Sequence, residues 1–374
     1  MAFQSSRIER MRKAMQEHDL DVLYIRELSN IIWATGFEDV FDTEDAHALI
    51  VSQDSLVLHS DFRYEEALRR EASSTDIVID TQRSSHQALL AKIIKSIQKT
   101  QPIRVGIENS LKLSEYRSLE KQGVVDQSIE WCELDRFVEL LREVKDEEEI
   151  ALMKKAQAIT DKAFARILDF IVPGMTEREV QMQLDRYMFE EGAQGLAFNT
   201  IVATGAHGSS PHAIPSDIPL LQGDAVVMDF GAKYGEYCSD MTRTIFIGTP
   251  SSELSHAWDT LCSVNESCES MIRAGVIARD VHNHAESLLA EAGYKGKMGH
   301  SLGHSVGIDI HESPNLSPLN SKPLQEGNVV TVEPGIYLPG KFGMRLEDFG
   351  VVTPDGFNVF TQSSHKMFII NKLN

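Results

Sequence analysis

Apolar and polar positions follow different patterns in the two parts of the chain, and the change falls near residues 130–145. In the first part, short apolar runs alternate with amphipathic stretches in which apolar residues recur every three to four positions. This alternation predicts an α/β domain with a mixed sheet. Its expected strands are 21–25, 48–51, 56–59, 76–79 and 105–107, and its expected helices are 7–18, 64–71 and 87–97.

Longer elements are predicted in the second part. Residues 134–171 form an almost continuous helical pattern, and the acidic stretch at 145–149 suits the beginning of a helix. Thr176 and Glu179 have the spacing of a capping box for the next helix. We therefore divide the chain into an α/β domain, 1–132, and a domain of helices and antiparallel strands, 133–374. The further elements expected in it are strands 198–203, 225–230, 236–247, 329–337 and 344–352, and helices 253–274 and 279–292.

Composition excludes some partners. The 374 residues include 36 Lys plus Arg against 56 Asp plus Glu, which gives a formal net charge of −20. Such a surface repels nucleic acids and anionic membranes. No apolar run is long enough for a membrane span, and the first residues lack the apolar segment of a signal peptide. The four cysteines contain no CxxC motif, so a reducing cytoplasm is the simplest compartment.

Two hairpins are predicted to bring acids together. Asp229 and Asp240 are equally distant from a turn centred on Tyr234-Gly235. Directly opposed side chains in an antiparallel pair lie about 5 Å apart at Cβ, so the two carboxylates should repel unless a cation lies between them. In the second hairpin, Glu333 and Glu347 are each seven residues from Gly340, which predicts the same opposition.

A glycine-flanked stretch between the two hairpins supplies His300, His304 and His311, and His212 lies further toward the N-terminus. Four carboxylates with imidazole suit a pair of divalent ions, which lower the pKa of a shared water and yield a hydroxide nucleophile. A single aspartate on a strand is usually an ordinary surface residue. Two opposed pairs beside a histidine cluster favour a metal centre.

Competing motifs fit less well. The segment 303–307, GHSVG, matches the GxSxG elbow of serine hydrolases, and Asp348 and His365 follow in the right order. That elbow requires a strand before it and a helix after it, which the flanking residues do not predict. His311-Glu312 does not extend to HExxH, because position 315 is asparagine. Cys238 has no evident activating base and is expected to serve packing.

These residues resemble the pita-bread metallopeptidases, the family of methionine aminopeptidase, aminopeptidase P and prolidase. The resemblance is strong over about residues 150–370, and the preceding domain is similar to the N-terminal domain of the prolidase, aminopeptidase P and creatinase branch. It implies a creatinase-type N-terminal domain followed by a curved antiparallel sheet flanked by helices. The family's ordered ligands fall within the contexts DFG, SDMTRT, GHSVG, VEPG and RLED, on Asp229, Asp240, His304, Glu333 and Glu347.

The resemblance also implies a role for each ligand. Asp229 would bind one ion in a bidentate manner, His304 and Glu333 would bind the other, and Asp240 and Glu347 would bridge the two. The ions would be manganese, with cobalt, zinc or iron as alternatives that tolerate the same ligands.

Further roles concern the substrate. Glu333 would accept a proton from the bridging hydroxide, His212 would contact the scissile amide, and His311 would stabilise the oxyanion, which needs fixed donors. His300 would line the pocket for proline. Arg345 would either bind a substrate carboxylate or steady a metal-ligating acid, and both roles stay open.

The implied activity is that of a metallo-exopeptidase, a cytoplasmic homodimer that cleaves the Xaa-Pro bond at the N-terminus of peptides or in dipeptides. A dipeptidase must recognise the nearby C-terminal carboxylate, whereas an aminopeptidase must leave that side open. The alternatives are a hydrolase or lyase of a small non-peptide substrate and a non-catalytic pseudo-peptidase. The five retained ligands argue against the first, and the presence of Asp229, His304 and His212 argues against the second.

One stretch departs from the family pattern, because residues 38–45 are acidic where small residues are common. In this branch the N-terminal domain can reach the partner subunit's active site. The acidic loop could therefore select basic substrates. A solvated loop with no such role is the favoured interpretation.

Overall fold

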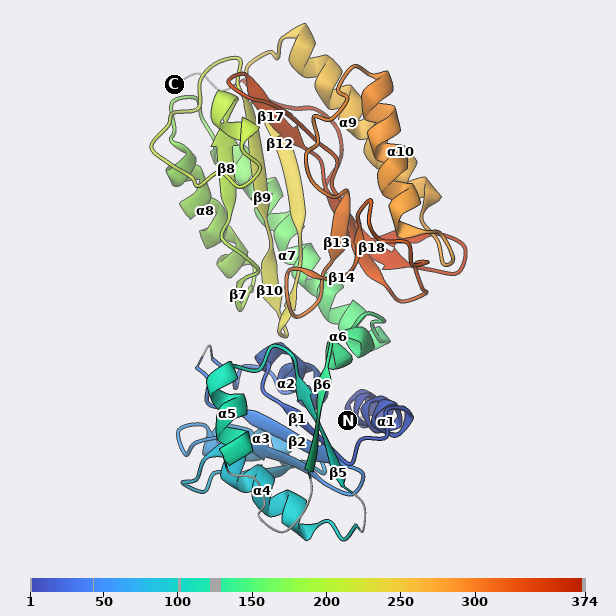
Figure 1. Cartoon of the computed structure of the whole chain (residues 1–374). Coiled ribbons are helices and arrows are strands. Elements are labelled where there is room, and N and C mark those ends of the chain that lie inside the picture. The colour runs from blue at the N-terminus through green and yellow to red at the C-terminus, as the bar shows by residue number, and fades with distance from the viewer. Residues whose placement is uncertain (1, 43, 100–101, 122–128, 372–374) are drawn as a thin grey trace. The chain divides into compact units, whose positions relative to one another are not determined.

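The computed structural model describes residues 2–42, 44–99, 102–121 and 129–371. The chain divides into two compact units, Met1–Arg142 and Glu143–Asn374, which are drawn in Figure 1. The division lies later than the predicted boundary at 132/133, because β6 (Ile129–Leu134) and α6 (Phe137–Arg142) belong to the first unit. None of the helices in the described ranges combines the length and apolar character needed to cross a membrane.

The first unit contains the predicted mixed sheet. Its described strands follow the order β4-β3-β2-β1-β5-β6, with β1, β5 and β6 parallel and β2 antiparallel to both of its neighbours. The bounds are β1 (Val22–Ile25), β2 (Ala48–Ser52), β3 (Leu56–His59), β4 (Val78–Asp80), β5 (Ile103–Glu108), α1 (Ala2–Glu17), α2 (Leu28–Thr35), α3 (Glu65–Ala72), α4 (His86–Ser96) and α5 (Leu113–Lys121).

Three elements of this unit were not predicted: α2, α5 and β6. Helix α2 is buried from Asn30 to Thr35, so it has no polar face that would produce helical periodicity. In helix α5, Leu119 is the one buried residue, so the helix has no apolar face that would produce helical periodicity. Strand β6 has a single buried position, Leu134, so its alternation is weak.

In the second unit, helices cover both faces of a mainly antiparallel sheet, of which one edge strand is parallel to its neighbour (Figure 1). One apolar core joins α7 (Glu147–Phe170) and α8 (Glu177–Glu190) to the central strands, and another joins α9 (Ser252–Met271) and α10 (Ala278–Glu291) to later strands. The remaining elements are β7 (Gly195–Leu196), β8 (Ile201–Thr204), η1 (Gly205–Ser209), β9 (Ala225–Phe230), β10 (Ala232–Tyr234), β11 (Tyr237–Cys238), β12 (Met241–Ile247), β13 (Gly303–Ser305), β14 (Glu312–Leu316), β15 (Val329–Val332), β16 (Gly335–Leu338), β17 (Phe342–Arg345), β18 (Asp348–Val352), β19 (Phe357–Val359) and β20 (Phe368–Ile370).

Capping explains where the first two helices of this unit begin. Thr176 and Glu179 form the predicted capping box of α8. The helical pattern over 134–171 is divided between α6 and α7, and α7 begins within the predicted acidic stretch, where Asp146 has an extended backbone and accepts a hydrogen bond from the Glu149 N–H. An extended capping residue ends the helical conformation between α6 and α7.

The long predicted strands are interrupted at the acids. The segment 236–247 breaks before β12 at Asp240, 329–337 breaks at Glu333-Pro334, and 344–352 breaks at Leu346-Glu347. At each break an acid lies directly beside the end of a strand: Asp240 before β12, Glu333 after β15 and Glu347 before β18.

Candidate metal centre and its cavity

The first hairpin has a different register from the predicted one. Asp229 pairs with Thr242, and the turn occupies Gly235-Glu236, both with left-handed φ, of 55° and 68°. The predicted turn would have placed a bulky tyrosine in that strained conformation. The predicted direct opposition of Asp229 and Asp240 is therefore wrong by two residues. Because side chains alternate with period two, a slip of two residues keeps both acids on one face.

Core packing fixes which face that is. Met228 and Phe230 flank Asp229 on β9 and pack in the core formed with α7 and α8. Alternation then turns Asp229 to the opposite side of the strand. On β12, Met241 belongs to the same core, so Thr242 and Asp229 share the other face.

The second hairpin has the predicted register. Gly335 pairs with Arg345, and Val332 pairs with Asp348, so the ladder on either side of the break puts Glu333 level with Glu347. Gly340, with φ of 77°, lies in the turn between these strands.

Backbone hydrogen bonds at the breaks join the segments. The Glu347 N–H donates to the Thr242 carbonyl (3.1 Å), which ties the second hairpin to the first. The Glu333 N–H donates to the Leu302 carbonyl (2.8 Å), which ties it to the histidine segment. Gly303 is required at this seam, since a Cβ there would lie 2.1 Å from the Thr331 carbonyl oxygen.

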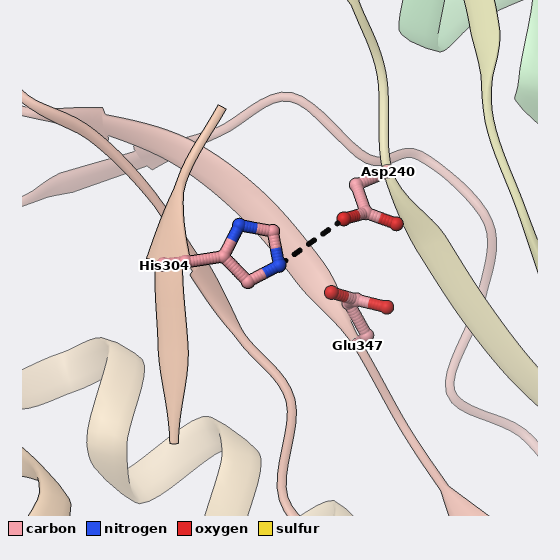
Figure 2. A group of neighbouring side chains, drawn as sticks. All are labelled: Asp240, His304 and Glu347. Atoms are coloured by element: carbon pink, nitrogen blue, oxygen red, sulfur yellow. Dashed lines mark ion pairs between the residues drawn. The ribbon is translucent and has the colours of Figure 1, made fainter. Parts of the chain in front are cut away.

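The predicted ligands converge on one point. Asp240, His304 and Glu347 each offer a ligand atom, and these atoms lie within 4.8 Å of one another (Figure 2). His304 Nε2 is 3.5 Å from Asp240 Oδ2 and 3.5 Å from Glu333 Oε1. His304 Nδ1 lies 3.1 Å from the Ser305 carbonyl, so Nδ1 carries the proton and Nε2 is free to act as a ligand.

Asp229 approaches the same centre from β9. The guanidinium of Arg345 binds Asp229 Oδ2, while the buried Oδ1 is without a hydrogen-bond partner among the described residues. Arg345 also donates to Tyr337 OH (2.8 Å) and to Thr242 Oγ1 (2.9 Å). The Thr242 hydroxyl donates in turn to Glu347 Oε2 (2.6 Å). Arg345 is therefore fully engaged by the residues that surround the acids.

The acids are crowded and dehydrated. Burial, followed by repulsion from neighbouring carboxylates, raises the pKa of Asp240 and of Glu347 well above ordinary values. Burial raises the pKa of Glu333 to about 8 and lowers the pKa of His304 to about 4. A neutral imidazole with an excess of buried carboxylates, one of them with an orphaned oxygen, fits divalent cations.

A cavity of about 470 Å³ opens over this cluster and contains every predicted site residue. His300 is held by the Ser301 carbonyl (2.7 Å) and by Tyr337 OH (3.2 Å). The His311 ring lies 4.4 Å from that of His304, measured between centroids, and His212 lines the wall. The sequence did not single out the rest of the lining: Phe198, Asn199, Ile201, Pro211, Ser301, Gly303, Ile310 and Asn315.

Lys145 is a further residue that the sequence did not indicate. Its ammonium group is buried, donates to Ser305 Oγ (2.8 Å) and pairs with Glu312 Oε2 (3.0 Å). Ser305 and Glu312 follow His304 and His311 directly, so one lysine clamps the backbone beside two site histidines. In the sequence Lys145 belonged to a charged stretch interpreted as a helix start, and no local pattern reveals a partner 160 residues away.

The same contact excludes a serine nucleophile. Ser305 is fully buried, lies on β13 and is bound by Lys145 rather than by a histidine. No helix follows it, since the next element is β14. Asp348 and His365 do pair (2.5 Å), but Asp348 also binds Arg243, which contacts the Glu347 carbonyl.

In the acidic loop at 38–45, three carboxylates have partners within the first unit. Asp42 accepts a hydrogen bond from Tyr64 OH (2.7 Å), and Glu44 pairs with Arg63 (2.6 Å). Asp45 is bound by Arg26 and Lys112. These contacts support the interpretation of the loop as a solvated structural segment.

Comparison with known proteins gives matches over nearly the whole chain. Residues 151–354 match the metallopeptidase family M24, and residues 7–144 match the creatinase/prolidase N-terminal domain. An uncharacterized peptidase of Bacillus subtilis is 33% identical over 97% of this chain and 100% of its own length.

Solved structures agree with this match. The Xaa-Pro dipeptidase from Bacillus anthracis has a TM-score of 0.88 and 35% identity, over 98% of this chain and 99% of its own. The X-Pro aminopeptidase from Thermotoga maritima has a TM-score of 0.85 and 32% identity, over 96% and 100%.

Proposed function

The chain belongs to metallopeptidase family M24, with a creatinase/prolidase N-terminal domain, and from this premise we propose that it hydrolyses Xaa-Pro bonds at the N-terminus of peptides or in dipeptides. The observation that carries the proposal is the convergence of Asp240, His304 and Glu347 at the base of one cavity. Relatives named Xaa-Pro dipeptidase and X-Pro aminopeptidase, alike over almost the full chain, support it.

The proposed ligands are those of the predicted set. Two divalent ions, manganese first and cobalt, zinc or iron as alternatives, would be held by Asp229, Asp240, His304, Glu333 and Glu347. When bound, such ions supply Lewis-acid activation of a water molecule and of the scissile carbonyl.

The other residues of the cavity serve the peptide. Glu333 accepts a proton from the attacking water and delivers it to the prolyl nitrogen, which must be protonated to leave. His311 donates to the oxyanion as the carbonyl carbon becomes tetrahedral, and His212 contacts the scissile amide. His300, fixed between Ser301 and Tyr337, forms the wall against the proline ring. A homodimer and a cytoplasmic location stay predictions from the sequence.

Metal removal tests the proposal. Exhaustive chelation should lower kcat/KM on Ala-Pro-Ala by at least about 1000-fold, and added manganese should restore it, because metal activation is worth several kcal/mol and each 1.36 kcal/mol is tenfold in rate. Ala-Ala-Ala is the matched control and should be cleaved poorly throughout. Activity that survives chelation would contradict the metal centre. Failure to cleave either Ala-Pro or Ala-Pro-Ala would favour the small-molecule alternative.

The acidic loop supplies a second test. We expect Asp42→Asn with Glu44→Gln to leave the ratio of kcat/KM for Arg-Pro-Ala and Ala-Pro-Ala unchanged within about twofold, since these acids are engaged by Tyr64 and Arg63 and exposed pairs contribute little. Steady-state kinetics on the two peptides measures the ratio. A tenfold loss of preference for arginine would instead assign substrate selection to the loop.

A further inference from the structure

Strand β14 presents Asn315 to the cavity. Glu312 binds the buried Lys145, and Leu316 packs in the core formed with α9 and α10. Side chains alternate along a strand, so the intervening positions face the other way, and Asn315 lines the cavity together with His311. Ser317 Oγ donates to Asn315 Oδ1 (3.1 Å), and Asn320 Nδ2 donates to the Asn315 carbonyl (2.7 Å), which holds this residue at the edge of the cavity.

The side chains of the cavity offer little positive charge to a substrate. Among the described residues that line it, Arg345 is the one arginine or lysine, and its guanidinium is engaged by Asp229, Thr242 and Tyr337. It is also 4% exposed. Besides the histidines, the other acidic or basic side chains of the lining are four carboxylates, Asp229, Asp240, Glu333 and Glu347, whose charge the two proposed divalent ions would balance.

The histidines that line the cavity have other partners or proposed roles, so none is assigned to a substrate carboxylate. His300 has both ring nitrogens engaged, one by the Ser301 carbonyl and one by Tyr337 OH. His304 points its Nε2 at the acids. The proposed function uses His212 and His311 at the reacting amide and its oxyanion.

A dipeptide would bring a negative charge into this cavity. In Xaa-Pro the C-terminal carboxylate is attached to the proline Cα, two bonds from the scissile nitrogen, so it must enter with the reacting bond. The proposed ions would be engaged by the acids and the reacting bond, so this carboxylate would find no side-chain cation and would lose hydration that no partner replaces. In a longer peptide the same position is a neutral amide, which can both donate to and accept from an asparagine side chain.

We propose that this cavity selects peptides longer than two residues, and that Asn315 sets the preference by offering a neutral amide where a dipeptidase needs a cation. The inference rests on the proposed function and deepens it, since it makes the protein an aminopeptidase rather than a dipeptidase. Asn315 acts as a specificity-determining residue in this scheme.

Three substrates separate charge from length. Ala-Pro, Ala-Pro-NH₂ and Ala-Pro-Ala share the scissile bond, and the second removes the charge of the first without adding a residue. We expect kcat/KM for Ala-Pro-NH₂ and Ala-Pro-Ala to exceed that for Ala-Pro by at least about tenfold, the equivalent of about 1.4 kcal/mol. Cleavage of Ala-Pro as fast as the other two would overturn the inference alone. Cleavage of none would remove the proposed function and the inference with it.

A variant tests the role of Asn315 directly. Asn315→Arg should raise kcat/KM on Ala-Pro by about tenfold or more, because a guanidinium pairs with carboxylates, and should bring no gain on Ala-Pro-NH₂. Asn315→Gln keeps the neutral amide and should retain the wild-type order of substrates. Leu319→Arg adds the same charge at a position that is 91% exposed and outside the cavity lining, and should change neither ratio. A gain on Ala-Pro from Leu319→Arg equal to that from Asn315→Arg would contradict the assignment.

Discussion

Asp240→Ala is expected to lower kcat/KM on Ala-Pro-Ala by at least about 1000-fold without unfolding the protein, since it removes one of three ligand atoms within 4.8 Å of one another. The remaining residues keep their backbone bonds, because the fold at this point depends on the Glu347 and Glu333 amides rather than on the Asp240 side chain. Metal content measured by mass spectrometry should fall in parallel with activity.

The same substitution should make the chelated protein no less stable. Asp240 is buried beside Glu347, Asp229 and Glu333, and its pKa in the folded protein is raised above the unfolded value of about 3.9. A raised carboxyl pKa supports folding below the unfolded pKa, and that support is lost as pH rises through the folded pKa. Asp240→Ala should therefore flatten the decline in melting temperature of the chelated protein as pH rises above about 4.

Asp259→Ala is the matched control, because Asp259 is exposed on α9 in the same unit. It should leave activity, metal content and the pH profile of stability unchanged. Wild-type activity in Asp240→Ala would remove Asp240 from the metal centre. A large loss of stability in the chelated variant would contradict the argument from crowding.

Lys145→Met is expected to destabilise the protein by about 3–5 kcal/mol, since it removes the cation paired with the buried Glu312 carboxylate. Ser305 loses a hydrogen bond at the same time. Because Ser305 and Glu312 adjoin His304 and His311, metal affinity should fall by about 10–100-fold, as when a supporting partner of a ligand is lost.

A double substitution tests whether the loss of stability comes from the unpaired charge of Glu312. Lys145→Met with Glu312→Gln removes both charges and should recover part of the stability, because the uncompensated carboxylate is gone. Lys162→Met breaks an exposed pair with Glu191 and should cost at most about 1 kcal/mol. Urea unfolding and metal titration check these values. Equal effects of Lys145→Met and Lys162→Met would show that the buried pair does not hold the site.

Local sequence patterns predicted which neighbouring strands pair and approximately in which register. The register of the second hairpin followed from Gly340, where the turn needs a left-handed residue. In the first hairpin the predicted turn, Tyr234-Gly235, lies one residue before the observed turn, Gly235-Glu236, which keeps the bulky tyrosine out of the left-handed region. The side-chain period of two preserved the main conclusion, because it kept Asp229 and Asp240 on one face.

What the sequence could not supply are contacts between distant segments. Arg345 joins Asp229 to Tyr337, and Lys145 reaches Ser305 and Glu312, but none of these pairs has a spacing typical of one element. Helix α2 was missed for a different reason, since burial on all sides removes the polar positions that reveal a helix. Fully enclosed elements and long-range ion pairs depend on the assembled fold.

At the strand breaks, the groups that hold the fold together differ from the groups expected to bind metal. Glu333 and Glu347 close the seam with main-chain N–H groups, which any residue except proline would provide at those positions. Their side chains are therefore free to diverge while the hairpins stay joined. A descendant of this chain could exchange its carboxylates one at a time, keep a folded cavity at each step, and pass to a new ligand without first rebuilding the sheet.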